Sequence, residues 1–332
     1  MITHVHIQNF RSFLDAQVDL QPFSLVVGAN GSGKSNLLKF FEVVSQKELG
    51  ETLLGRVPHQ GILWRCHTNL ATGCFGFEIV INSNERFCLR IDAGRRASDY
   101  SGDAPWSRAK VPIFNLIAED ISGVEKVQPK AVIGPTGKGT TQVLDMLKNG
   151  DREELFDQIE TLFRRYVPEV EKLSLRTVEE GLKQIQVRES GLNKPTPGPE
   201  LSEGTRLILA VLTIIHQEKP PPIILLEDID RGMHPRLFEY IAPLMKDIAV
   251  RTGVNILATT HNPYLVDAFQ DDKKAVIIVE KKDGASTLAS LEQKLEGIDY
   301  DKVDPDDLPL GQLWYSGLIG GTPEKISHRA RV

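Results

Sequence analysis

The stretch GANGSGKS, residues 28 to 35, combines the residue types and the spacing that bind phosphate groups. Its glycines let the backbone curl so that successive N–H groups point inward, and a helix that begins at the end of the loop adds positive potential. In this G-x-x-x-x-G-K-[ST] pattern the lysine ammonium reaches the β- and γ-phosphates of a nucleotide, and the serine hydroxyl binds Mg²⁺. We therefore expect a magnesium-nucleotide site formed by Gly28, Asn30, Gly31, Ser32, Gly33, Lys34, Ser35 and Asn36.

A second stretch, IILLEDID at residues 223 to 230, sets four apolar residues beside the carboxylates of Glu227, Asp228 and Asp230. A buried parallel strand delivers its last residues to the crevice where open α/β sheets bind ligands, and a magnesium-nucleotide site needs carboxylates there. We expect Glu227 to hold Mg²⁺ through water, and Asp228 to orient or deprotonate the attacking water. Taken alone, the stretch also fits a strand that ends in a charged surface turn.

The elements that position the phosphate loop are predicted from the first 45 residues. THVHIQ, DAQVDL and FSLVV are three short strands, and the last is apolar enough to be buried on both faces. From Gly33 the apolar residues adopt helical spacing and form one stripe. Strand, loop and helix thus follow in the order that the motif requires, and residues 74 to 92 predict a hairpin after them.

The acidic stretch lies in a second block, in which strands and helices alternate. The predicted elements are a helix from Glu203 to Gln217, a strand at 223–227, a helix from about Pro235, and strands at 255–260 and 275–280. Such alternation implies a mostly parallel sheet with helices on both faces. The expected fold class is therefore α/β, a P-loop NTPase fold that also contains an antiparallel β portion and an inserted, partly helical lobe.

The two blocks suggest a discontinuous core with an insertion. The expected divisions are a core of residues 1–100 and 200–290, an inserted lobe of residues 101–199, and a C-terminal extension of residues 291–332. Within the lobe, residues 140–166 predict two helices, with Asp151 as the cap of the second, and 171–178 and 182–189 predict two strands.

Composition narrows the function classes. The 41% of hydrophobic and 25% of charged residues are typical of soluble domains. The longest apolar stretches are much shorter than the roughly twenty residues that span a bilayer, so no membrane partner is expected. A net charge of −6 argues against coating nucleic acid through bulk electrostatics, which makes nucleic acid an optional partner. Three cysteines and an N-terminus without a recognisable secretory signal indicate a cytoplasmic protein.

Four motifs, in this order, resemble those of the ATP-binding-cassette (ABC) ATPases. They are GANGSGKSN, LSEGT at 201–205, LLEDIDRGMHP, and ATTHNPYLVD at 258–267, which resemble the family's phosphate loop, signature, acidic strand and switch-histidine segment. IQNFRSF near the start and DRGMHP after the acidic strand resemble the SMC/RecF/OLD branch rather than the transporters. The motifs cover mainly residues 1–45 and 200–270.

This resemblance implies further roles. In the branch two heads dimerise head-to-tail around ATP, so Ser202 and Gly204 would contact, in trans, the γ-phosphate held by the other head. Ser202 also suits the N-cap of the helix that follows it, and the two roles are compatible. His261 would hydrogen-bond the γ-phosphate, and Arg11 would lie near the nucleotide. Gln60, within VPHQG, is a further candidate for contact with the metal.

Departures from the family pattern also matter. The family's acidic pair is Asp-Glu or Glu-Glu, whereas Glu227 and Asp228 place the shorter carboxylate at the expected catalytic position. One missing methylene moves the oxygens roughly an ångström from the water, which can cost about a hundredfold in rate. We therefore expect slow hydrolysis and a long-lived ATP-bound dimer.

Two features of related proteins are not expected in this sequence. About 70 residues follow His261, too few for the Toprim nuclease domain of OLD proteins, and no long heptad arm is recognised.

The expected function is that of a Mg²⁺-dependent ATPase whose dimerisation, or larger assembly, switches a partner effector such as a nuclease or toxin in bacterial anti-phage defence. A RecF-like DNA-repair ATPase that clamps DNA is one alternative, and the motor subunit of an ABC transporter is another. A scaffold that binds ATP without useful hydrolysis is a third. Four residues that could bind zinc, His59, Cys66, His67 and Cys74, lie close together in the sequence. Their spacing lacks the C-x₂-C pairs of structural zinc sites, so we expect no zinc there.

Overall fold

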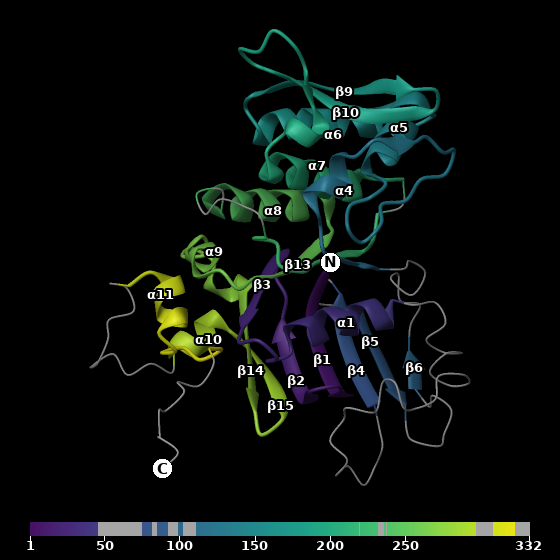
Figure 1. Ribbon diagram of the computed structural model, residues 1–332. Coiled ribbons are helices and arrows are strands. Elements are labelled where there is room, and N and C mark those ends of the chain that lie inside the picture. Colours follow the sequence, from purple (N-terminus) through teal and green to yellow (C-terminus); the bar gives the residue numbers. More distant parts are fainter. Residues whose placement is uncertain are drawn as a thin grey trace, which may run out of the picture.

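A six-stranded sheet forms the centre of the computed structural model (Figure 1). The strand order is β15-β14-β3-β13-β12-β7, and all neighbours pair in parallel except β14 and the edge strand β15. The predicted mostly parallel sheet is thereby confirmed. The bounds are β3 Phe23–Gly28, β7 Ile113–Phe114, β12 Ile223–Leu226, β13 Asn255–Thr259, β14 Val276–Lys282 and β15 Ala285–Ser290.

The structure describes residues 1–45, 75–81, 85–91, 99–101, 111–218, 220–231, 236, 238–296 and 308–322. The predicted role of Gln60, and the expectation of no zinc at His59, Cys66, His67 and Cys74, lie outside the described residues. These two points therefore stay predictions.

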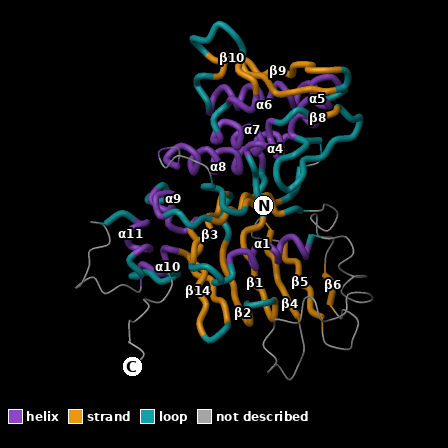
Figure 2. The backbone as a smooth tube through the Cα atoms, in the orientation of Figure 1, coloured by secondary structure: helices purple, strands orange, loops and turns teal. Residues whose placement is uncertain are grey.

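The central strands separate two hydrophobic cores. Successive strand side chains point to opposite faces, so a strand covered on both faces must be apolar throughout. All six residues of β3 are buried: Leu25 faces the core that contains helices α7 (Glu203–His216) and α8 (Phe238–Thr252), while Val26 faces the core of helix α1 (Lys34–Val44). Helices on both faces of the sheet were predicted and are found (Figure 2).

A second, antiparallel sheet has the strand order β2-β1-β4-β5-β6, and the apolar side chains of β1 and β2 pack into the core around α1. A tight turn joins β1 to β2, where Phe10 pairs with Phe13 and both side chains are fully buried. The first two predicted strands and the hairpin at 74–92 are confirmed by this sheet. Its bounds are β1 Ile2–Phe10, β2 Phe13–Asp19, β4 Phe75–Ile81, β5 Glu85–Ile91 and β6 Asp99–Ser101.

A smaller sheet and two helices lie beyond α7 in Figure 1, and a third, short helix lies against α7. The two helices and two strands predicted for this region are found, but the predicted cap is wrong. Helix α6 has Arg152 as its N-cap without a side-chain hydrogen bond, and two glutamates in its first turn complement the helix dipole instead of Asp151. The bounds are α4 Ala118–Ser122, β8 Glu125–Lys126, α5 Thr140–Asn149, α6 Glu153–Tyr166, β9 Val170–Glu179, β10 Leu182–Glu189 and β11 Thr196–Pro197.

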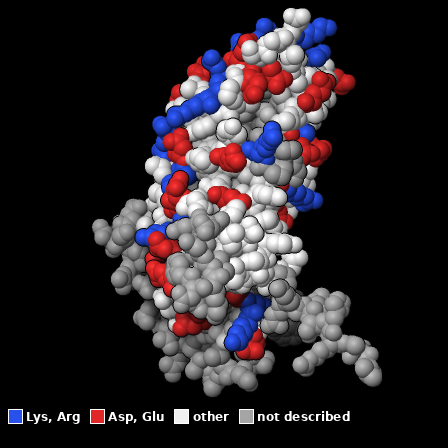
Figure 3. Space-filling model, turned by 90° about the vertical axis from the view of Figure 1, so that its left-hand side faces the viewer, with Lys and Arg blue, Asp and Glu red and all other residues white. Residues whose placement is uncertain are grey.

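Three short helices flank β14 at the side of the central sheet: α9 Pro263–Asp267, α10 Leu291–Glu296 and α11 Leu310–Tyr315 (Figure 1). Across the described ranges, no helix combines the length and the apolar character needed to cross a membrane. Among the described residues in Figure 3, lysines and arginines are interspersed with carboxylates, so these residues give no uniform field of one sign.

Candidate functional site

The loop between β3 and α1 follows a path that requires glycine at two positions. Gly31 and Gly33 have φ values of 76° and 124°, in the left-handed region that side chains with a Cβ disfavour. A Cβ on Gly33 would also lie 2.7 Å from Ser286 Oγ. Glycine is therefore needed in the motif both for its backbone conformation and for the close approach of the loop to Ser286 on β15.

Ser286, on β15, fastens this loop to the rest of the fold. Its hydroxyl donates a hydrogen bond to the carbonyl oxygen of Ser32 at 2.5 Å, and its N–H donates to the carbonyl oxygen of Ser12 at 2.6 Å. Ser286 is buried, so both bonds are shielded from water. The loop is thereby tied to the turn between β1 and β2, which fixes its position before any ligand arrives.

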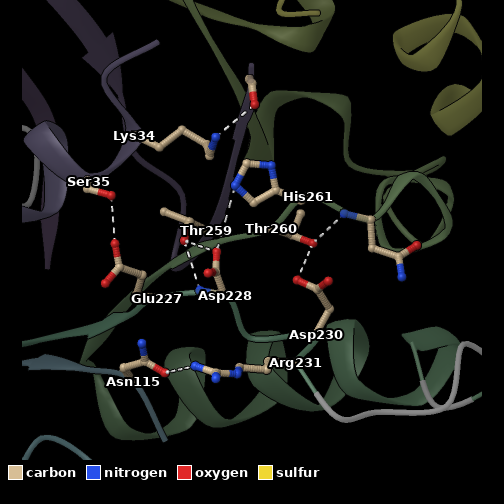
Figure 4. A network of polar contacts seen from close by, with 12 residues as sticks. Lys34, Ser35, Asn115, Glu227, Asp228, Asp230, Arg231, Thr259, Thr260 and His261 are labelled. Atoms are coloured by element: carbon tan, nitrogen blue, oxygen red, sulfur yellow. Dashed lines mark hydrogen bonds and ion pairs between the residues drawn. The ribbon is translucent and has the colours of Figure 1, made fainter. Parts of the chain in front are cut away.

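Lys34 lies across the loop that precedes it. Its Nζ donates to the carbonyl oxygens of Gly28 at 2.8 Å and Ala29 at 3.1 Å (Figure 4). Burial lowers the pKa of Lys34 to about 8, and the nearby carboxylates of Asp228 and Glu227 partly oppose this shift. The ammonium is thus a buried, poorly solvated cation, well placed to gain from an anionic ligand.

The hydroxyl of Ser35 donates to Glu227 Oε1 at 2.6 Å. Glu227 comes directly after β12, and its backbone N–H donates to Phe114 O at 2.8 Å, which extends the pairing with β7. A hydroxyl and a carboxylate within 2.6 Å of each other offer the oxygen donors that Mg²⁺ prefers. The two residues predicted to bind Mg²⁺ therefore fit that ion, although their role stays a prediction.

Asp228 occupies a constrained position beside Glu227. Its φ of 51° lies in the left-handed region, which aspartate tolerates better than most residues. Thr259 Oγ1 accepts a hydrogen bond from the Asp228 N–H at 2.9 Å and lies 3.5 Å from Asp228 Oδ1. His261 Nε2 is 4.0 Å from the same carboxylate oxygen, so the predicted base and the predicted switch histidine face each other (Figure 4).

Asp230 has a different environment from Asp228. Its Oδ1 accepts a hydrogen bond from Thr260 Oγ1 at 2.5 Å, and Thr260 Oγ1 in turn accepts from the N–H of Asn262 at 3.0 Å. The Asn262 side chain caps α9 by accepting from the N–H of Tyr264. Asp230 therefore fixes the turn that carries His261, whereas Asp228 faces the His261 side chain itself.

The charge of His261 is set by its surroundings. Burial lowers its pKa, the ammonium of Lys34 lowers it further, and the carboxylates of Asp228 and Asp230 oppose the shift. Its pKa lies below the ordinary value, so the imidazole is mainly neutral at pH 7. A neutral ring can donate one hydrogen bond and accept another, which suits contact with a phosphate oxygen.

Arg11 lies in the turn between β1 and β2. Its backbone has a φ of 52°, and its Nη1 donates to Asn36 Oδ1 at 3.1 Å. The Asn36 amide donates to Ser12 Oγ at 2.8 Å. Arg11 is thus held beside the first turn of α1, and its predicted place near a nucleotide stays a prediction.

Ser202 forms the N-cap of α7. Its Oγ accepts a hydrogen bond from the Thr205 N–H at 3.1 Å, which confirms the predicted cap. Ser202 is exposed, whereas Gly204 is buried in the first turn. Ser202 hydrogen-bonds Thr205 within its own helix, and its predicted role in trans stays a prediction.

Several residues around the site were not predicted. Asn115 follows the two-residue strand β7 and accepts a hydrogen bond from Arg231 Nη1 at 3.3 Å. Thr259 ends β13 and holds Asp228, Thr260 follows the strand and holds Asp230, and Ser286 holds the loop. Each lies at or beside the end of a strand, but only pairing between distant segments reveals which strand ends meet.

Two family models match parts of the chain that carry Lys34, Ser35, Glu227, Asp228 and His261. An AAA ATPase domain model matches residues 1–92, and the model described as "AAA domain, putative AbiEii toxin, Type IV TA system" matches residues 143–267. An SMC head solved with the C-winged helix domain of ScpA is 16% identical, covers 89% of this chain and 99% of its own, and has a TM-score of 0.58. The chain has the fold of an SMC head-like P-loop NTPase, and two of its segments match models of AAA-type ATPase domains.

Further proteins are similar to this chain in structure or in sequence. The SMC head domain from Thermotoga maritima is 16% identical, with a TM-score of 0.51 over 87% of this chain and 98% of its own. The chromosome segregation protein sudA of Emericella nidulans is 28% identical over 169 residues, 48% of this chain and 13% of the relative. The structural maintenance of chromosomes protein 1B of Mus musculus is 26% identical over 161 residues, 47% of this chain. The chain spans only 12% of that mouse relative's length.

Proposed function

We propose that this ATPase binds ATP with Mg²⁺, dimerises head-to-tail around the nucleotide, and thereby switches a partner effector. One observation carries the proposal. Lys34, Ser35, Glu227 and His261 converge from three separate strand ends on one edge of the parallel sheet (Figure 4). A cation, a hydroxyl, a carboxylate and a neutral imidazole in this arrangement match the needs of a triphosphate and its metal.

The chain's own residues would divide the work as follows. The loop N–H groups and Lys34 would bind the phosphates, while Ser35 and Glu227 would hold Mg²⁺, which supplies charge neutralisation for the leaving phosphate. Asp228 would orient the attacking water and take its proton, and His261 would hydrogen-bond the γ-phosphate. Arg11, which donates to Asn36, would lie near the nucleotide.

We expect hydrolysis to be slow. The Asp228 backbone is fixed by Thr259 in a left-handed conformation, so the short side chain has little freedom to approach a water placed for a longer carboxylate. A slow step would leave the ATP-bound dimer long-lived, which suits a switch better than a motor. A turnover number on the order of 10 per second or more would contradict this expectation.

The trans arrangement can be tested by complementation. Lys34→Ala should abolish ATP binding, and Ser202→Arg should block closure of the other head, so each variant alone should fail to hydrolyse ATP. A head-to-tail heterodimer of the two contains one intact site, formed by Lys34 of one chain and Ser202 of the other. Mixing should therefore restore activity. If the mixture stays as inactive as its components, the site does not form in trans.

The effector is proposed to be a protein, such as a nuclease or toxin in anti-phage defence. The match to a model described as a putative AbiEii toxin domain supports this class, as does an SMC head of similar fold that is bound to the C-winged helix domain of ScpA. Pull-down of a tagged Asp228→Asn variant from native cells with ATP and Mg²⁺ should recover the partner in stoichiometric amount. Recovery of DNA with repair proteins would instead indicate a RecF-like clamp, an alternative that the comparisons do not favour.

A further inference from the structure

Residues 308–322, here called the C-terminal segment, are packed into the main core of the ATPase. Leu310, Leu313, Trp314 and Ile319 are each at most 6% exposed and belong to the same core as β3 and α7. Helix α11 of this segment lies against α9 (Figure 1). The segment therefore contributes to the core rather than trailing away from it.

The first attachment of the segment is to the part of the chain that carries the switch histidine. The N–H of Gly311 donates to Asp267 Oδ1 at 2.7 Å. A Cβ on Gly311 would lie only 2.1 Å from the carbonyl oxygen of Pro263, so the two backbones are in direct contact. Pro263 is the second residue after His261, and Asp267 is the last residue of α9.

The second attachment is to the strand beside the phosphate loop. The N–H of Gly321 donates to Glu280 Oε1 at 3.1 Å, and Lys294 donates to the other oxygen of this carboxylate. Trp314 Nε1 donates to the carbonyl oxygen of Gly321 at 3.3 Å. A Cβ on Gly321 would lie 3.6 Å from the Cα of Gly28, the first residue of the phosphate loop.

From these contacts we propose that Asp267 and Glu280 are positioning residues, which fasten the C-terminal segment to both sides of the ATP site and so strengthen ATP binding. The proposal rests on the proposed role of the phosphate loop and His261. Asp267 holds the segment behind the histidine turn, and Glu280 holds it behind the loop. The segment thus connects two parts of the site that different strands deliver.

Thermodynamic linkage gives this arrangement a measurable consequence. If docking of the segment favours the binding geometry, bound ATP must favour docking by the same factor. ATP should therefore slow hydrogen exchange of amides in residues 308–322, although neither positioning residue is expected to touch the nucleotide. Loosening the segment should weaken ATP binding in return.

The test compares variants in the full chain by hydrogen exchange and by ATP titration. Asp267→Ala and Glu280→Ala should speed exchange in residues 308–322 and raise the Kd of ATP by about fivefold, a typical coupling between linked sites. Asp267→Asn keeps an oxygen that can accept from Gly311 and should restore the wild-type Kd. Asp272→Ala is the matched control, because Asp272 is paired with Lys246 and not with the segment.

The outcomes separate this inference from the proposed function. Faster exchange in the segment with an unchanged Kd of ATP would overturn the positioning role and leave the ATP site intact. A wild-type chain that fails to bind ATP would refute the proposed function first. Should either alanine variant fail to fold, ATP-dependent exchange protection of residues 308–322 in the wild type decides the question, and its absence overturns the proposal.

Discussion

Thr259 Oγ1 contacts Asp228 twice, accepting from its N–H at 2.9 Å and lying 3.5 Å from its Oδ1. A side chain at the end of β13 therefore sets the conformation of a residue at the end of β12. The contact holds Asp228 at a φ of 51°, which aims its carboxylate toward His261. Thr259 itself is 1% exposed, so this control is exerted from inside the core.

Thr259→Val should lower the rate of ATP hydrolysis by about tenfold without weakening ATP binding. Valine matches threonine in shape but cannot accept the Asp228 N–H, and a buried N–H without a partner costs about 1–3 kcal/mol. Asp228 would then lose its fixed conformation. Steady-state kinetics should show a lower kcat at a constant Kd. Thr259→Ser retains the hydroxyl and should stay close to the wild type; equal losses in both variants would point to packing instead.

Asp228→Asn and Asp230→Asn should differ in their effect on hydrolysis. Asparagine at 228 cannot accept a proton, so turnover should fall at least about tenfold while ATP binding persists. Asp230 is hydrogen-bonded to Thr260, and asparagine at 230 can still accept that bond through its carbonyl oxygen. Turnover of the second variant should therefore change less. The opposite ranking would make Asp230 the base.

Glu227→Gln should raise the Mg²⁺ concentration needed for half-maximal hydrolysis. The amide keeps an oxygen that accepts from Ser35, so the 2.6 Å contact between the side chains can persist without the charge. Mg²⁺ favours charged oxygen ligands, and the loss of one weakens its binding. Titration of activity with Mg²⁺ at saturating ATP measures the shift. An unchanged midpoint would remove Glu227 from the metal site.

The sequence could predict site residues where the strand or helix pattern of the adjacent residues indicates their place in the fold. Gly33, Lys34 and Ser35 lie between a strand and a helix that the local pattern predicts, and Glu227 follows a run of buried apolar residues. By contrast, Asn115 follows β7, a strand of only two residues. That strand exists because it pairs with β12, which is more than a hundred residues away in the chain.

Dependence on contacts between distant parts of the chain also explains why the docking of the C-terminal segment was not predicted. α11 has six residues, too few for a helical pattern to be recognised, and such short helices are marginal without tertiary contacts. One of its contacts is with Asp267, which accepts a hydrogen bond from the N–H of Gly311 across 44 positions in the chain. Ser286 is similar, because nothing in the sequence of β15 indicates that this serine reaches the phosphate loop.

The affinity for ATP should fall as pH rises above about 8. Burial lowers the pKa of Lys34 to about 8, so free Lys34 is charged at pH 7 and largely neutral at pH 9.5. Phosphate binding favours the charged form, so above the pKa each bound nucleotide must also bring a proton to Lys34, which raises the Kd about tenfold per pH unit. Below pH 7 this group contributes no pH dependence. Lys34→Arg keeps its charge throughout this range and serves as the control, because any binding it retains should not show the rise. A Kd for the wild type that stays constant from pH 7 to pH 9.5 would mean that Lys34 does not meet the phosphates as a buried ammonium.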